Sequence, residues 1–235
     1  VAFFAYPDKP SLLAPSQAEL HTLAGFEDDL VGALQALADE LGANGLAPAG
    51  VAQRSPAGAM PTGKLAPEGI AAVLTALIPE NAIVVDEAVT TGRSFGAPTS
   101  GAAPHDWLCG MGGSIGFGLP CAIGAAVAAP DRKVIALEGD CSVYMPLPSL
   151  WTMARESLDV TVVIFANRSY QILRGEFAGV GAGAPGPRAS DMLTIDRPDL
   201  DWVSLARGMG VEATRAEDLG QLAAQLRRAL AHRGP

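Results

Sequence analysis

The chain has 235 residues, of which 49% are hydrophobic and 17% charged, with a formal net charge of −9. The hydrophobic fraction excludes a disordered chain, and the acidic balance argues against nucleic-acid binding, which requires a basic face. No apolar run reaches the roughly 18 residues of a membrane span. The three cysteines, Cys109, Cys121 and Cys141, form no C-x-x-C pair and indicate reduced thiols. We therefore expect a cytoplasmic globular protein that contacts neither nucleic acid nor membrane.

The first part of the chain predicts one strand and one helix. The apolar run VAFFAYP at 1–7 is typical of a buried strand, and residues 27–42 have apolar side chains at helical spacing. Residues 43–66 are rich in Ala, Gly and Pro and lack any periodicity. We interpret 1–45 as the tail of a middle α/β domain and 46–63 as a linker, and because the chain opens within a strand we expect a fragment of a longer polypeptide.

From residue 64 to residue 235 helical and strand patterns alternate. Strands are expected at 82–87, 106–109 and 133–139, in the run VTVVIFAN that ends at Asn167, and weakly at 211–215. Helices are expected at 67–78, 116–129, 150–158, 170–177, 201–208 and 217–230, with a mobile Gly- and Pro-rich loop at 179–190. Fully apolar strands alternating with helices predict a doubly wound, mostly parallel sheet with helices on both faces. Ligands of such sheets bind beyond the carboxyl ends of the strands.

Two polar side chains follow neighbouring strands of this predicted sheet. Asp140 ends the apolar run VIALEG, and Asn167 comes 27 residues later at the end of the next run. That separation is long enough for a helical crossover between adjacent parallel strands, so the two oxygens could meet at one rim. A carboxylate and a carboxamide suit Mg²⁺ better than zinc. The alternatives remain that Asp140 is a helix cap, a turn residue or a catalytic base and that Asn167 closes a turn.

The run GDCS followed by ANRS resembles the diphosphate- and metal-binding motif of thiamine-diphosphate-dependent enzymes. The resemblance continues through VVDEAVTTG, GGSIGFGLPCAIGAA, LWTMARE, NRSYQILRGEF and DWVSLARGMGV. It covers residues 64–235 and is nearest to the acetolactate synthase and benzoylformate decarboxylase branch. It implies that this part of the chain is the carboxy-terminal cofactor-binding domain with the thiamine-diphosphate-binding fold.

The resemblance also implies a role for individual residues. The metal ligands would be the side chains of Asp140 and Asn167 and the backbone carbonyl of Ser169. Ile115 would hold the cofactor in a bent conformation, and Leu173 would line the substrate pocket, although without the resemblance plain core packing is the better interpretation of both side chains. The remaining contacts to the cofactor would come from Thr90, Gly113, Gly139, Cys141, Ser142 and Tyr170.

The implied activity is that of a lyase or transferase acting on a 2-oxo acid, with thiamine diphosphate and Mg²⁺ as cofactors. The product would be an aldehyde after decarboxylation, as in benzoylformate-type enzymes, or an acetolactate-type product after transfer to a second 2-oxo acid. The use of FAD stays open. In the family the catalytic glutamate lies in an amino-terminal pyrimidine-binding domain, whose motif Glu87 and Glu138 do not match. We expect the full-length form to be a homodimer or homotetramer and the isolated chain to be inactive.

Three residues depart from the family pattern. Cys141 stands where the family has Gly or Ala, so a thiol must fit beside the diphosphate. Pro146 and Pro148 stand where helix formers are expected, and a proline inside a helix costs about 3 kcal/mol. The helix that contains LWTMARE is therefore expected to start late.

Other classes of protein compete with this interpretation. Gly112-x-Ser114-x-Gly116 fits the nucleophile elbow of a serine hydrolase, for which Asp199 or Asp201 and then His232 would complete the triad. His232 lies near the end of a polar helix, and the other two histidines precede the serine, in the wrong order. The run GFGLPC lacks the third small residue of a dinucleotide fingerprint. A non-catalytic remnant that only binds cofactor is the third alternative.

Overall fold

The computed structural model describes residue 17 and residues 21–25, 27–47, 50, 53–54, 59–110 and 113–235. The chain divides into two compact units, Val1–Val51 and Ala52–Pro235. The strand expected at 1–7 lies outside the described residues. Among the described helices, none is both long and apolar enough to cross a membrane.

The first unit contains helix α1, Leu30–Glu40, within the predicted range 27–42. The helix begins where the Asp29 carboxylate accepts a hydrogen bond from the Gly32 amide at 3.0 Å. The chain then turns at Gly42, whose φ of +63° lies in the left-handed region that favours glycine. The part of this unit that the structure describes holds no strand, so it does not test the predicted α/β character.

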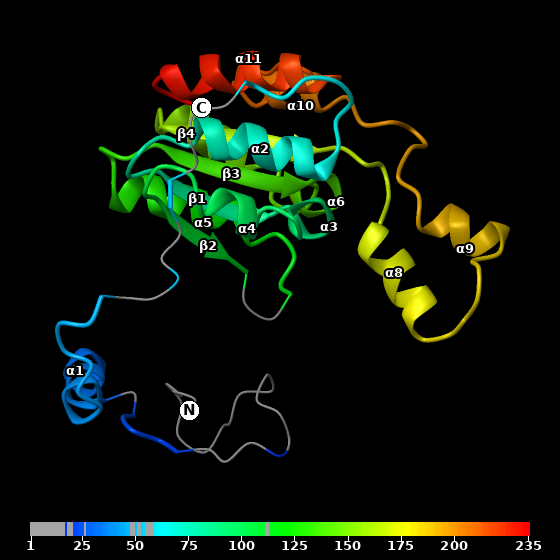
Figure 1. Cartoon of the computed structure of the whole chain (residues 1–235). Helices are drawn as coiled ribbons and strands as arrows, with labels where there is room; N and C mark the ends of the chain where they lie inside the picture. Colours follow the sequence, from blue (N-terminus) through cyan, green and yellow to red (C-terminus); the bar gives the residue numbers. More distant parts are fainter. Residues whose placement is uncertain are drawn as a thin grey trace. The chain divides into compact units, whose positions relative to one another are not determined.

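The second unit is built on a parallel sheet of four strands in the order β2-β1-β3-β4 (Figure 1). The strands are β1 (Ile83–Glu87), β2 (Asp106–Cys109), β3 (Val134–Gly139) and β4 (Val160–Phe165). All four were predicted. Because every strand runs in the same direction, all four carboxyl ends lie along one rim.

Helices cover both faces of this sheet. On one face Val84, Ile135 and Leu137 pack with Leu74 of α2 and Leu226 of α11. This layer is formed by α2 (Pro67–Leu77), α4 (Gly96–Thr99) and α11 (Leu219–Ala231). Alternate strand residues point to the other face, because side chains along a strand alternate between the two faces.

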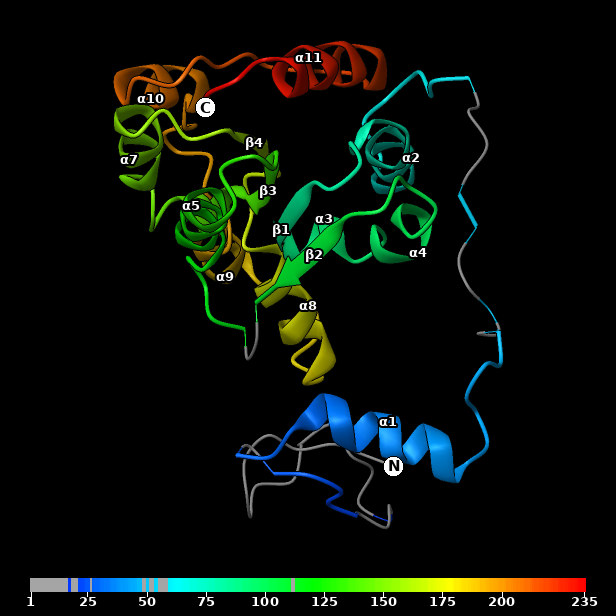
Figure 2. The same cartoon turned by 90° about the vertical axis from the view of Figure 1, so that its left-hand side faces the viewer.

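On the second face Val85, Val134 and Ala136 pack with Leu119 of α5 and Met153 of α7. This layer is formed by α5 (Gly118–Ala128), α7 (Ser149–Arg155) and α10 (Trp202–Gly208). Figure 2 shows α5 and α7 on one side of the sheet and α2 and α4 on the other. The doubly wound fold is therefore confirmed.

Short elements follow the carboxyl rim. They are α3 (Val89–Gly92), α6 (Asp140–Val143), α8 (Gln171–Gly179) and α9 (Pro187–Met192). Helices α8 and α9 project from this end of the sheet as a hairpin (Figure 1). Helix α9 occupies part of the loop predicted to be mobile at 179–190, with Pro187 at its first position, where proline is tolerated.

Two sequence expectations about elements have different outcomes. The helix after Asp140 is interrupted, since α6 ends at Val143 and α7 starts only at Ser149, with Pro146 and Pro148 between them. The late start is confirmed. The prediction of a weak strand at 211–215 was wrong, because this segment forms no ladder with a neighbouring strand, although Val211 is buried in the core and Ala213 packs against it.

Candidate cofactor and metal site

Asp140 lies at the carboxyl end of β3 with 2% of its surface exposed. Its Oδ1 accepts a hydrogen bond from the Cys141 amide at 2.9 Å, and its Oδ2 accepts one from the Arg168 amide at 2.6 Å. Burial raises the pKa of the Asp140 carboxyl, although the two amides oppose this shift. A carboxylate offers about four acceptor positions. Two therefore remain for a cation, which would offset the cost of burying the charge.

Asn167 lies two residues beyond β4, next to the amide that Asp140 holds. Its Oδ1 accepts a hydrogen bond from the Ser169 amide at 2.9 Å, and one acceptor position of that oxygen remains. The Ser169 hydroxyl donates to the Leu193 carbonyl at 3.1 Å. The structure thus places Asp140, Asn167 and Ser169 on two adjacent turns of one rim. These oxygen donors fit Mg²⁺.

A metal site built from several charged or sulfur ligands is not supported. The described residues include no group of three or more His, Cys, Asp or Glu side chains that could hold an ion. A site that combines one carboxylate with an amide and a backbone carbonyl needs no such group. It would also leave coordination positions for water and phosphate oxygens, as Mg²⁺ sites in proteins commonly do.

The other predicted contact residues lie in or next to short elements that follow the strands. Ser142 is buried beside Asp140 in α6, and Gly139 precedes it in extended backbone. Burial and the nearby Asp140 charge raise the pKa of the Cys141 thiol, so it stays protonated at neutral pH. Thr90 is half-buried in α3, which packs against α8, and Tyr170 immediately precedes α8.

The remaining predicted residues are exposed at the same rim. Gly113 has a φ of +69°, in the left-handed region, and Ile115 is 54% exposed in the segment between β2 and α5. Leu173 is 49% exposed on α8. Since neither apolar side chain is buried, plain core packing does not explain Ile115 or Leu173.

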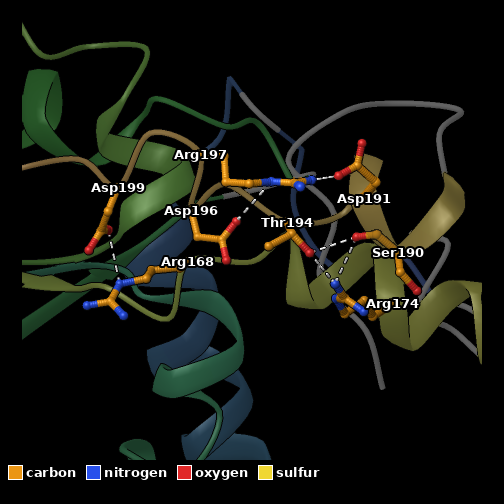
Figure 3. A network of polar contacts seen from close by, with 8 residues as sticks. All are labelled: Arg168, Arg174, Ser190, Asp191, Thr194, Asp196, Arg197 and Asp199. Atoms are coloured by element: carbon orange, nitrogen blue, oxygen red, sulfur yellow. Dashed lines mark hydrogen bonds and ion pairs between the residues drawn. The ribbon is translucent and has the colours of Figure 1, made fainter. Parts of the chain in front are cut away.

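A polar network holds the α8–α9 hairpin closed at its base (Figure 3). Arg174 donates to the Ser169 hydroxyl at 2.8 Å, to the Thr194 hydroxyl at 2.6 Å and to the Ser190 carbonyl at 3.2 Å. Ser169 and Thr194 also form an antiparallel bridge. The segment predicted to hold the metal is therefore tied to the far end of the hairpin.

Ion pairs connect this base to the following chain. Arg168 pairs with Asp199 at 3.0 Å, and Arg197 pairs with Asp191 and, at 3.8 Å, with Asp196 (Figure 3). All five side chains are at least 43% exposed, so these pairs contribute little to stability. These pairs link the residues before α8 and at the end of α9 to the chain that follows the hairpin.

The sequence interpretation missed two buried carboxyl groups next to the loop at 113–117. Glu87 is 6% exposed and accepts hydrogen bonds from the Gly116 and Gly118 amides, and Glu138 beside it is fully buried. They are paired across β1 and β3 in register. The available signal was a glutamate near the carboxyl end of each of two adjacent apolar strands.

The hydrolase triad is not assembled. Asp199, Asp201 and His232 line one cavity, but Ser114 does not line it. The His232 carbonyl accepts a hydrogen bond from Lys133, just before β3, whereas Ser114 lies beyond the carboxyl end of β2. A strand of six residues separates those rims by about 20 Å. The Gly116 and Gly118 amides of the GFG run are bonded to Glu87 rather than free for a dinucleotide.

Comparison with known proteins identifies the family. Residues 95–235 match the model of the thiamine pyrophosphate enzyme, C-terminal TPP binding domain. The chain belongs to the thiamine-pyrophosphate enzymes. The cofactor implied by the GDCS and ANRS motifs is thus the cofactor of the family, and the matched range contains every predicted site residue except Thr90.

Relatives of this thiamine-pyrophosphate domain carry two kinds of name. The whole chain aligns with 45% of the length of a Mycobacterium tuberculosis protein named "Putative acetolactate synthase large subunit IlvX", and the two are 50% identical over the aligned part. In a second alignment, 76% of the chain matches 32% of the length of the benzoylformate decarboxylase of Pseudomonas aeruginosa, with 37% identity. A structure of the thiamine diphosphate-dependent 4-hydroxybenzoylformate decarboxylase of Rhodococcus jostii RHA1 matches 90% of the chain, with a TM-score of 0.70 and 27% identity. The chain covers 39% of that protein, so it spans less than half the length of these relatives.

Proposed function

We propose that this chain is the carboxy-terminal part of a thiamine-diphosphate-dependent enzyme acting on 2-oxo acids, and that it binds the cofactor diphosphate through Mg²⁺. The observation that carries the proposal is the buried Asp140 carboxylate, which is bonded to the amide next to Asn167. In this proposal residues 1–45 are the tail of a middle domain and 46–63 a linker. The full-length protein is a cytoplasmic homodimer or homotetramer.

The metal ligands in this proposal are Asp140, Asn167 and the Ser169 carbonyl. Ser142 and the backbone of Gly139 and Cys141 would contact the diphosphate, together with Thr90 and Tyr170. Gly113 and Ile115, on the segment before α5, would contact the ring portion of the cofactor, and Leu173 would line the substrate pocket. When bound, the cofactor supplies the electron sink that decarboxylation of a 2-oxo acid needs.

The residues of this chain would bind and orient rather than transfer protons. Asp140 and Asn167 fix the metal, whose charge compensates the diphosphate in an acidic protein. The exposed apolar side chains of Ile115 and Leu173 would exclude water from the reacting carbon once they are covered. The names of the relatives support both acetolactate-type carboligation and benzoylformate-type decarboxylation.

The test is cofactor binding by calorimetry, with and without Mg²⁺. The wild-type chain should bind thiamine diphosphate only when the metal is present. Asp140→Ala should weaken binding by more than about tenfold, because it removes a metal ligand and not merely a group that supports one. Asp131→Ala removes an exposed carboxylate just before β3, at the opposite rim, and should bind like the wild type. Metal-independent binding, or equal binding by both variants, would refute the proposed site.

A further inference from the structure

Two buried glutamates lie side by side inside the second unit. Glu87 is the last residue of β1 and Glu138 the fifth residue of β3, and the two are directly paired in the parallel register. Their side chains point to the face covered by α5, as do those of Val85 and Ala136. Glu87 is 6% exposed and Glu138 is 0% exposed.

The two carboxyl groups differ in their hydrogen bonds. Glu87 accepts hydrogen bonds on both oxygens, from the Gly116 amide at 2.6 Å and from the Gly118 amide at 2.5 Å. The two oxygens of Glu138 are buried and have no hydrogen-bond partner among the described residues. Burial raises the pKa of Glu138 to about 9, and the charges of Glu87 and Asp86 add to this shift.

The Gly118 amide is the first amide of α5, and the Gly116 amide lies two residues before the helix. The helix begins at Gly118, and no side chain near Phe117 caps it. The first amides of a helix have no partner within the helix, and a negative charge there is favourable. Glu87 supplies a hydrogen-bond acceptor and a negative charge at this helix start, although it lies 29 and 31 residues away in the sequence from the two amides. It acts as a long-range cap for α5.

The close approach leaves no room for a side chain at residue 118. A Cβ there would lie 2.0 Å from Glu138 Oε1 and 2.9 Å from Glu87 Oε2. Gly116 has a φ of +87°, in the left-handed region. The GFG run is therefore explained by the carboxyl pair, since both glycines let the backbone reach Glu87.

From this geometry we propose that Glu87 is a positioning residue, which fixes the segment at 113–118 against the rim of the sheet, with Glu138 buried beside it. The inference rests on the proposed function, in which Gly113 and Ile115 of this segment contact the cofactor. Gly113, Ser114 and Ile115 are all exposed, so the position of these residues depends on where the chain is tied at Gly116 and Gly118. Without that tie the segment would have to be ordered when the cofactor binds, which weakens binding.

The two glutamates should respond differently to the same substitution. Glu138→Gln keeps the size of the side chain and leaves both hydrogen bonds of Glu87 in place. Glu87→Gln removes the charge and turns an NH₂ group toward one of two backbone donors, so at least one amide loses its acceptor. A pair that served only to fill space would show no such asymmetry, because the two variants have the same size.

The experiment compares both variants with the wild-type chain in two measurements. The first is hydrogen exchange of the segment at 113–118 without cofactor or metal. Glu87→Gln should speed it by more than about tenfold, as expected when a bonded amide loses its acceptor, and Glu138→Gln should leave it unchanged. The second is the Kd for thiamine diphosphate with saturating Mg²⁺, which should rise about tenfold or more for Glu87→Gln alone. Peptides from β3 and β4 should exchange at wild-type rates in both variants.

The outcomes separate the two proposals. Faster exchange in Glu87→Gln without any cofactor binding by the wild type would leave Glu87 as a positioning residue and remove the proposed function. Wild-type exchange and affinity in Glu87→Gln would overturn the role of Glu87 while the proposed function stands. Equal damage in both glutamine variants would also overturn it. If Glu87→Gln does not fold, the double variant Glu87→Met and Glu138→Met removes both buried carboxyl groups. Proteins often tolerate such a replacement of buried ionic groups by apolar side chains of similar volume. Wild-type exchange in that variant would overturn the inference, and faster exchange would support it.

Discussion

The carboxyl groups of Glu87 and Glu138 leave no room for a Cβ atom at Gly118. Gly124 lies in the same helix, but a Cβ there would meet no atom within 4 Å. The two positions thus share helical backbone and differ only in what lies beside them. Glycine at 118 is required by contact, whereas glycine at 124 only adds freedom to the unfolded chain.

We predict that Gly118→Ala destabilises the chain and Gly124→Ala does not. The methyl group at 118 would displace two buried carboxyl groups, and overpacking of this kind costs about 1–3 kcal/mol. Alanine at 124 should stabilise by about 0.5–1 kcal/mol, because it restricts the unfolded chain. Urea unfolding of both variants measures the difference. Equal changes in midpoint would contradict the contact seen at Gly118.

The raised pKa of Glu138 predicts a pH dependence of stability. Its ordinary value near 4.5 applies to the unfolded chain and about 9 to the folded one, so between these values the folded state binds one more proton. The free energy of unfolding must then fall as the pH rises, by up to about 1.4 kcal/mol per pH unit. Glu138→Gln should remove this slope and make the chain more stable than the wild type at pH 8.

Urea unfolding at pH 5.5, 7 and 8.5, with a metal chelator present, measures both slopes. The pKa of Asp140 is also raised, so the difference between wild type and variant isolates Glu138. Parallel slopes for the two proteins would mean that Glu138 is ionised in the folded state.

Site residues that follow strands could be predicted, and the buried pair could not. Asp140 and Asn167 stand where strand ends and parallel topology bring polar groups together. Glu87 and Glu138 were set aside because they match no catalytic motif. Their burial depends on the register of β1 against β3, which fixes which residues face each other and is not visible in either segment alone.

The helices of the second unit show which local patterns decide an element. The boundaries of α2 and α5 follow from helical spacing, and the gap between α6 and α7 follows from Pro146 and Pro148. Helix α9 was missed because glycine and proline dominate 179–190, although Pro187 suits a first helical position. The apolar residues at 211–215 resemble a strand, but strand formation also needs a partner.

We predict that Arg174 keeps the α8–α9 hairpin closed. Its guanidinium reaches three acceptors, on Ser169, Ser190 and Thr194, which a lysine ammonium cannot match in geometry. Arg174→Lys should therefore speed cleavage of 179–190 by thermolysin severalfold, while the melting temperature changes by less than about 2 °C, as expected for a peripheral change.

Arg155→Lys is the control for this prediction. Arg155 is 64% exposed on α7, where it lies over the Trp151 ring and pairs with Glu156. Its lysine variant should be cleaved at the wild-type rate. If Arg174→Lys is cleaved no faster than this control, the network at the base of the hairpin does not restrain it.

At the scale of the whole molecule, the alternation of apolar strands and helices was sufficient to predict the doubly wound fold. The central strands β1 and β3 are buried by helices on both faces, so their sequences are almost continuously apolar, and this distinguishes a parallel sheet from an antiparallel one. The edge strand β2 is largely exposed. The first unit is different, because the predicted strand at 1–7 lies outside the described residues.

The last prediction concerns the activity of the chain by itself. The chain spans less than half the length of its relatives. Of its buried acidic side chains at the rim, Glu87 is bonded to two amides, Glu138 lies beside it, and Asp140 is bonded to two amides and is the proposed metal ligand. The proposed site therefore gives none of the three a role in proton transfer.

We therefore expect the purified chain to bind thiamine diphosphate with Mg²⁺ but to show no turnover of pyruvate or benzoylformate. Loss of a general acid or base commonly lowers the rate by about 10²–10⁴-fold, and an open site adds to this loss. The assay uses the chain alone and the chain mixed with the amino-terminal domain of a benzoylformate decarboxylase relative. Turnover only in the mixture would support a site shared between domains. Turnover by the chain alone that disappears in Asp140→Ala would instead place the proton-transferring group within these 235 residues.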